Sequence, residues 1–112
     1  MITPQAITAA LIAGTATAYY TAPAVIRKAK LTGISITNSE TATPYTVTLH
    51  LVPSGGTASA TNMIVNAKSL AGGETWNVYE LENKTLLPGG MLQALASTTS
   101  KVNIQGTVLE YT

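Results

Sequence analysis

Apolar and polar residues alternate along several short stretches of this chain, which is the period of a β-strand with one buried face. The clearest case is Tyr45–Val52 (YTVTLHLV). Its two sets of side chains are Tyr45, Val47, Leu49 and Leu51 on one face and Thr46, Thr48 and His50 on the other. This pattern predicts an antiparallel strand that buries one face and presents the other to solvent.

Other stretches rich in threonine, tyrosine and aliphatic residues predict further strands. They are Thr15–Thr21, Val25–Asn38, Met63–Lys68, Glu74–Leu81, Met91–Ser97 and Lys101–Tyr111. The apolar parity shifts near Gly33, which predicts a β-bulge there. The pairs Gly55-Gly56, Gly72-Gly73 and Gly89-Gly90 mark turns. Short strands at short intervals, without a long helical period, predict an all-β fold: a single-domain antiparallel β-sandwich or jelly roll over residues 14–112.

The segment Met1–Ala13 is open to two interpretations. Thr3 and Pro4 suit the start of a short helix, with Ile2 and Ile7 as a hydrophobic staple. The β-rich remainder favours an N-terminal arm or strand instead. No charged side chain precedes Arg27, so the positively charged start of an export signal is missing, and we expect the segment to belong to the fold. Threonine and tyrosine also interrupt it too often for a membrane span.

Composition limits the classes of function. The 112 residues are enough for one domain, and 46% of them are hydrophobic. Only 10% are charged, against about 25% in typical domains, so hydroxyls and amides must cover the surface. Such a surface repels neighbours weakly and suits a dense assembly. The net charge of +1 argues against nucleic-acid binding, and the absence of cysteine excludes disulfides and thiolate chemistry.

The residues that commonly carry catalysis form no convincing constellation. His50 is the single histidine, and the chain has no Asp to orient it and no G-x-S-x-G motif. We interpret it as a solvated or interface histidine. Glu80 and Glu82 would share a strand face, but paired carboxylates act on glycosides only across a cleft. We therefore predict no catalytic, cofactor-binding or metal-binding residues, no cofactor, and no enzymatic activity.

Two groups of residues suit binding instead. Arg27, Lys28 and Lys30 contain half of the basic side chains and either contact an acidic partner or protect an edge strand. Trp76 and the tyrosines either form a sugar-stacking patch or, since the chain lacks Phe, supply the aromatic core. We expect burial for these aromatic rings.

Most of the chain resembles a pattern found in small structural proteins of tailed phages. One part is GTATAYYTAPAVIRKAKLTGISITNSETATPYTVTLHLVPSGG, where a tyrosine strand leads to a TAP turn and a strand ending in ITN. The second part is LAGGETWNVYELENKTLLPGGMLQALAS with a closing strand ending in VLEYT. In size and autonomy the chain is most similar to the capsid decoration or cement ("staple") proteins of short-tailed phages, the podoviruses.

This resemblance implies a β-sandwich that is made in the host cytoplasm and becomes part of the virion. It would bind the outside of the capsid and clamp neighbouring subunits of the major capsid protein, often as a homodimer or higher oligomer, without nucleic acid or membrane. The possible contact residues are Arg27, Lys28, Lys30, Ile2 and Ile7. Two alternatives remain open: a neck, tail or fibre component of the virion, and a carbohydrate-binding β-sandwich module.

Overall fold

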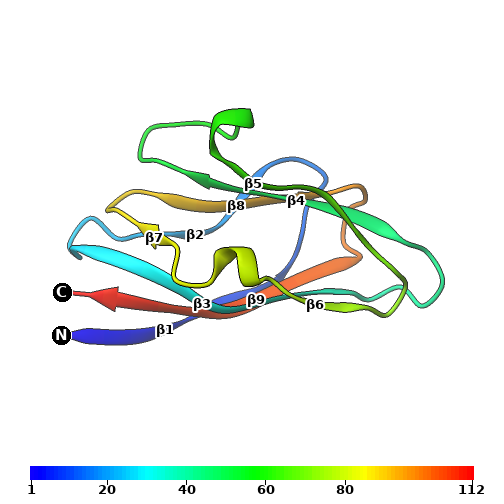
Figure 1. The fold of residues 1–112 in the computed structure, drawn as a ribbon, viewed down its shortest axis with the longest axis horizontal. Helices are drawn as coiled ribbons and strands as arrows, with labels where there is room; N and C mark the ends of the chain where they lie inside the picture. The colour runs from blue at the N-terminus through cyan, green and yellow to red at the C-terminus, as the bar shows by residue number, and fades with distance from the viewer.

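The computed structural model describes all 112 residues and consists almost entirely of β-strands (Figure 1). The strands are β1 (Ile2–Leu11), β2 (Thr17–Thr21), β3 (Lys28–Asn38), β4 (Tyr45–Val52), β5 (Met63–Leu70), β6 (Thr75–Asn77), β7 (Thr85–Leu86), β8 (Met91–Ala96) and β9 (Val102–Tyr111). Two single-turn 3₁₀ helices, η1 (Ala60–Asn62) and η2 (Tyr79–Leu81), complete the fold. No helix has the length and apolar character needed to span a membrane.

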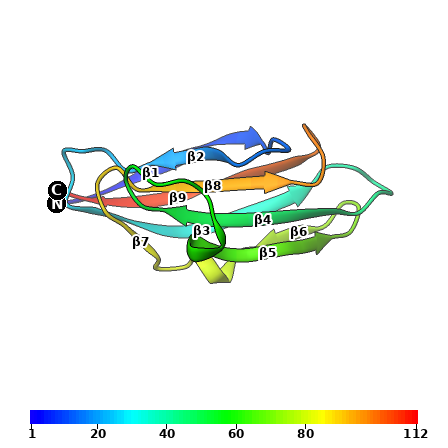
Figure 2. The same ribbon diagram turned by 90° about the horizontal axis from the view of Figure 1, so that it is seen from above.

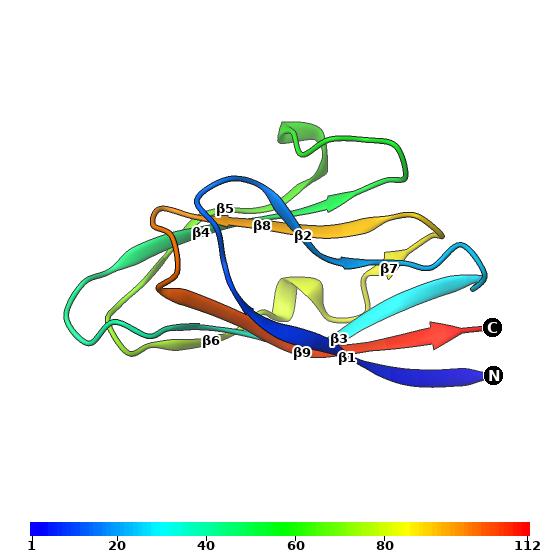
Figure 3. The same ribbon diagram turned by 180° about the vertical axis from the view of Figure 1, so that it is seen from behind.

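The strands form two antiparallel sheets packed face to face (Figures 1 and 3). Sheet A has the order β1-β9-β3-β6, with β7 also pairing with β3, and sheet B has the order β2-β8-β4-β5. Because β6 and β7 pair with opposite ends of β3, they occupy one strand position that η2 interrupts. The two sheets then have four positions each, as in a jelly roll. The predicted fold class is confirmed.

The hydrophobic core lies between the sheets and contains 20 buried residues. The inward side of β4 carries Val47 and Leu49, as its alternation predicts. On the open side of the sandwich, η2 inserts the fully buried Leu81 between the two sheets. In a two-layer sandwich the edges of the two sheets leave a gap between them on an open side, and here the single helical turn η2 fills this gap.

The first residues are part of sheet A. Strand β1 pairs with β9 along its length, and Ile7 and Ile12 belong to the core. Of the two interpretations of this segment, the helix is therefore wrong and the strand is confirmed, but residues 1–13 are part of the sandwich and not a separate arm. A strand forms here because β9 offers a complementary partner over ten residues, which outweighs the helix-start signal of Thr3-Pro4.

Two other predictions have different outcomes. The bulge near Gly33 is confirmed, since the register of β3 against β9 shifts between Thr32 and Ser35 and Gly33 has a φ of +62°. The strand predicted for Glu74–Leu81 is wrong in its second half, where the chain leaves β3 after β6 and turns into η2.

The sandwich is elongated, with extents of 44 × 26 × 20 Å, and its two ends differ (Figure 2). One end holds both termini, the β2–β3 turn and the β7–β8 loop. At the other end the buried Asn38 amide donates hydrogen bonds to the carbonyls of Thr43, Leu70 and Ala71 at 2.8–3.2 Å. These bonds tie the β3–β4 and β5–β6 connections together.

Candidate interaction face

The outer surface of sheet A near the termini combines residues from the neighbouring strands β1, β9 and β3. On β3 the buried Ala29 and Leu31 point inward, so Lys28 and Lys30 point outward. The register then forms two rows across the sheet. They are Ile2–Tyr111–Lys28 and Pro4–Leu109–Lys30. We call these six residues the Tyr111 face.

The basic side chains of the Tyr111 face lie against its aromatic ring. The ammonium group of Lys28 is 4.8 Å from the centre of the Tyr111 ring, and that of Lys30 is 5.9 Å from it. Neither forms an ion pair, because the single ion pair of the chain joins Lys101 to Glu40. A cation over a ring is held in place by the ring quadrupole while its charge stays available to a partner.

Behind this face a hydrogen bond links the two sheets. Tyr20 on β2 donates its hydroxyl to the Oε2 atom of Glu110 on β9 at 2.7 Å. Burial raises the pKa of Tyr20 well above its usual value, and the hydrogen bond to Glu110 adds to the increase. Glu110 therefore points into the sandwich and does not neutralise the lysines on the outer surface.

Strand β1 is the free edge of sheet A. Met1 and Thr112 exchange two backbone hydrogen bonds, at 2.9 and 3.1 Å, and such pairs alternate with non-bonded pairs in an antiparallel ladder. The backbone groups of Ile2, Pro4 and Ala6 consequently point away from β9. Pro4 has no N–H to offer there, which discourages unspecific strand pairing.

Three of the five sequence-predicted contact residues lie together, and two do not. Ile2, Lys28 and Lys30 come together on the Tyr111 face, and Arg27 is exposed in the turn before β3. Ile7 is only 4% exposed and belongs to the core, so it is not a contact residue. Sequence reasoning missed Leu109 and expected Tyr111 to be buried with the other aromatic rings. Only the register of β9 with β1 and β3 brings both residues to this surface.

His50 is buried, not solvated. It lies on the outward side of β4, but the loop 53–62 covers that side, and the histidine is 4% exposed. Its Nδ1 is 2.9 Å from the Oδ1 of Asn62, an acceptor, so Nδ1 carries the proton. The Asn62 amide in turn donates to the Thr57 carbonyl at 2.9 Å. His50 thus anchors a loop.

The acidic and aromatic candidates do not form a site either. Glu80 and Glu82 do not share a strand, since Glu80 lies in η2 and Glu82 follows it. Glu82 accepts hydrogen bonds from the Gly33 amide and the Thr32 hydroxyl and closes the bulge of β3. Trp76 packs against the core, with the Lys68 ammonium 5.7 Å from its ring. No group of three or more His, Cys, Asp or Glu side chains lies close enough to hold a metal ion.

No protein-family model and no curated protein matches the chain. A chain in a solved structure of Bacillus endospore appendages, described as a novel family of disulfide-linked pili, has a similar fold, with a TM-score of 0.55. The similarity covers 99% of this chain and 88% of the pilus chain. Their sequences are 17% identical, so the similarity concerns the fold alone.

Proposed function

We propose that this chain is a non-enzymatic structural protein of a phage virion. It binds the outside of the capsid and clamps neighbouring subunits of the major capsid protein. The observation that carries the proposal is the Tyr111 face, where apolar side chains and two unpaired lysines lie on one broad sheet surface. This surface suits a protein partner with carboxylates beside apolar groups, which is the kind of contact that a decoration protein needs.

A decoration protein stabilises a shell because it binds the assembled shell and not the separated subunits. Each copy needs only a modest interface, since about 800 Å² per partner is standard and capsid symmetry repeats the contact. The remaining surface, covered by hydroxyls and amides with 10% charged residues overall, tolerates close neighbours in a crowded lattice. The proposal also includes the association of copies of this chain with one another across a symmetry axis of the capsid.

The copy number of the chain in purified particles tests this function. Quantitative mass spectrometry would compare it with the major capsid protein of the same particles. We expect near-stoichiometric amounts. A few copies per particle would instead indicate the neck or tail, and complete absence from the particles would refute a virion role.

Charge reversal tests the Tyr111 face itself. The variant Lys28→Glu should bind stripped shells about tenfold more weakly and lose part of the salt dependence of binding. Lys68→Glu is the matched control, because Lys68 also lies over an aromatic ring but on a different part of the sandwich. Equal loss in both variants would mean that net charge, not this face, governs binding.

A second candidate is a subunit of a filament, including a tail or fibre of the virion. The similarity to the chain from disulfide-linked pili favours it. This chain has no cysteine, so its filament would have to be held together without disulfides. Electron microscopy of the purified protein at high concentration distinguishes the two functions, because a filament subunit forms fibres by itself and a decoration protein requires its shell.

A further inference from the structure

The β2–β3 turn, the β7–β8 loop and the start of β1 lie at the end of the sandwich that holds the termini (Figures 1 and 2), and each carries an exposed apolar residue. Val25 in the β2–β3 turn is 89% exposed, Leu87 in the β7–β8 loop is 68% exposed, and Ile2 at the start of β1 is 53% exposed. Single exposed aliphatic residues are ordinary, but three on adjoining segments of one end, two in turns and one at the start of a strand, require an explanation. We call Ile2, Val25 and Leu87 the apolar end.

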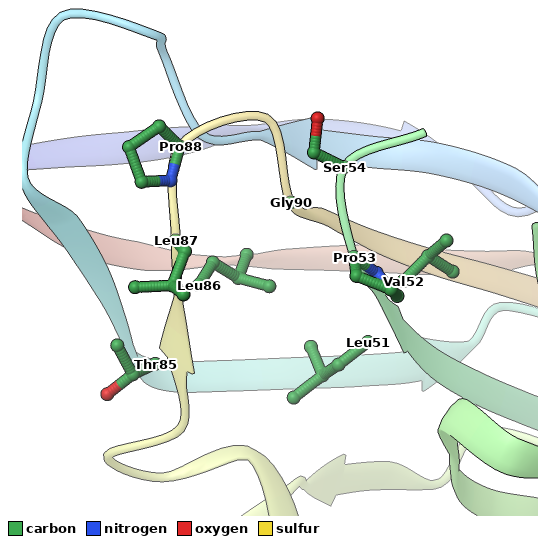
Figure 4. A pocket seen from close by; sticks show the side chains of 9 residues that line it. All are labelled: Leu51, Val52, Pro53, Ser54, Thr85, Leu86, Leu87, Pro88 and Gly90. Atoms are coloured by element: carbon green, nitrogen blue, oxygen red, sulfur yellow. The ribbon is translucent and has the colours of Figure 1, made fainter. Parts of the chain in front are cut away.

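A cleft of about 470 Å³ opens beside Leu87 (Figure 4). Leu86 and Leu87 lie on one side, and Leu51 and Pro53 on the other. The cleft exists because β5 pairs with β4 only as far as His50, while β7 has only two residues. The two sheets therefore end unevenly, which leaves Leu87 exposed and Leu51 only partly buried. Its volume falls within the range of ligand-binding clefts.

The turns that carry Val25 and Leu87 are fixed to each other. Ala22 exchanges two backbone hydrogen bonds with Gly89 and Gly90, both of 2.8 Å. At the other side of the turn, the Arg27 amide donates to the Tyr111 carbonyl at 2.8 Å. The apolar end is therefore held in place before any partner arrives, which lowers the entropy cost of binding.

The charges around the apolar end have one sign. Arg27 is exposed next to Val25, Lys28 follows it, and neither forms an ion pair. Glu110, on the strand paired with β3, points inward to Tyr20. A partner for this end therefore has to bring its own carboxylates.

A second copy of the chain fits poorly here. An end measuring 26 by 20 Å offers only about 500 Å², below the roughly 800 Å² per partner of a standard interface. Pairing two identical ends would also oppose Arg27 and Lys28 to their own copies, which repels. We propose that the apolar end and its cleft bind a short acidic segment of another protein, with an aliphatic side chain in the cleft and carboxylates against Arg27 and Lys28. This inference does not depend on whether the particle is a shell or a filament.

A displayed library of random twelve-residue peptides, selected on the immobilised full chain, tests the proposal. We expect the enriched peptides to combine aliphatic residues with Asp or Glu. An enriched peptide, synthesised and titrated, should bind Leu87→Glu and Arg27→Glu about tenfold or more weakly, because one apolar contact or one charge pair is worth that factor. Leu11→Glu, an exposed leucine on the far part of β1, should bind like the natural chain.

Amide chemical shifts of the natural chain with the same peptide locate the site without any variant, so misfolding of a variant cannot hide the result. Shifts confined to Val25, Leu87 and the walls of the cleft support the proposal. Enriched peptides without acidic residues, or shifts elsewhere, overturn it. Sedimentation with vesicles of three parts zwitterionic to one part anionic phospholipid is the second probe. Vesicle binding that Val25→Glu abolishes would replace the protein segment with a membrane surface.

Discussion

Replacing Tyr20 by Phe removes one hydroxyl and with it the hydrogen bond to Glu110 that joins β2 to β9. Hydrogen bonds to charged groups contribute about 1.5–3 kcal/mol to stability. Tyr20 is half-buried, so we expect the lower part of this range, about 1.5–2 kcal/mol. For 112 residues one kcal/mol corresponds to about 4 °C, so Tm should fall by about 6–8 °C at pH 7. Differential scanning calorimetry measures this change.

The pH dependence gives the same variant a second readout. The unfolded chain ionises a tyrosine near pH 10, whereas the raised pKa of Tyr20 keeps it neutral in the folded chain. Stability from this group is therefore complete below pH 10 and is lost as pH rises further. Tyr20→Phe should remove this alkaline loss. Glu110→Gln should keep most of it, because burial is the larger cause of the raised pKa.

Tyr79→Phe is the control, since its ring is largely exposed and its hydroxyl makes no hydrogen bond within the chain. It should leave Tm unchanged. A Tyr20→Phe variant that melts within 1 °C of the natural chain, with the same loss of stability above pH 10, would refute the account of the link between the sheets.

Leu81→Ala removes the side chain with which η2 fills the gap between the sheets. We expect urea unfolding to show a loss of about 2–5 kcal/mol in the free energy of unfolding. Leu11→Ala is the control and should change this free energy little, because Leu11 is exposed. If Leu81→Ala and Leu11→Ala had the same m-value and lost the same free energy of unfolding, the role of η2 would be contradicted. Gly72→Ala places a Cβ within 2.7 Å of the Thr41 carbonyl carbon and should cost about 1–3 kcal/mol. In Gly14→Ala the nearest atom to the new Cβ is the Thr99 hydroxyl oxygen at 3.2 Å. This variant should cost less, and thermal melts of the two variants can compare them.

The strands that alternate could be predicted from the sequence. Tyr45–Val52 has one apolar face over its whole length, and the structure places β4 on the same residues. β7 and η2 could not be predicted in this way, because two or three residues are too few to show a period. The N-terminal strand was left open because Thr3-Pro4 also suits a helix start. Its state depends on β9, which lies about a hundred residues away in the sequence.

The candidate site was predictable only in part. The cluster of basic residues is visible in the sequence, and so is the apolar character of Ile2. Their arrangement around Tyr111 depends on the register of three strands from different parts of the chain. The burial of His50 could not be foreseen either, since a loop and not a strand covers it. Local pattern determines which face of a strand is apolar, but long-range pairing and loops determine what becomes surface.

The central position of β9 has a consequence for the order of folding. β9 separates β1 from β3 in sheet A, and β8 separates β2 from β4 in sheet B. Strands β1 and β2 therefore have no partner in their sheets until β9 and β8 have been synthesised, whereas β3 and β4 can pair earlier with β6 and β5. Topologies with such distant pairings fold slowly, in milliseconds to seconds. During that time the nascent chain exposes unpaired strands, so its yield in cells should depend on the rate of synthesis and on chaperones more than on the stability of the finished sandwich.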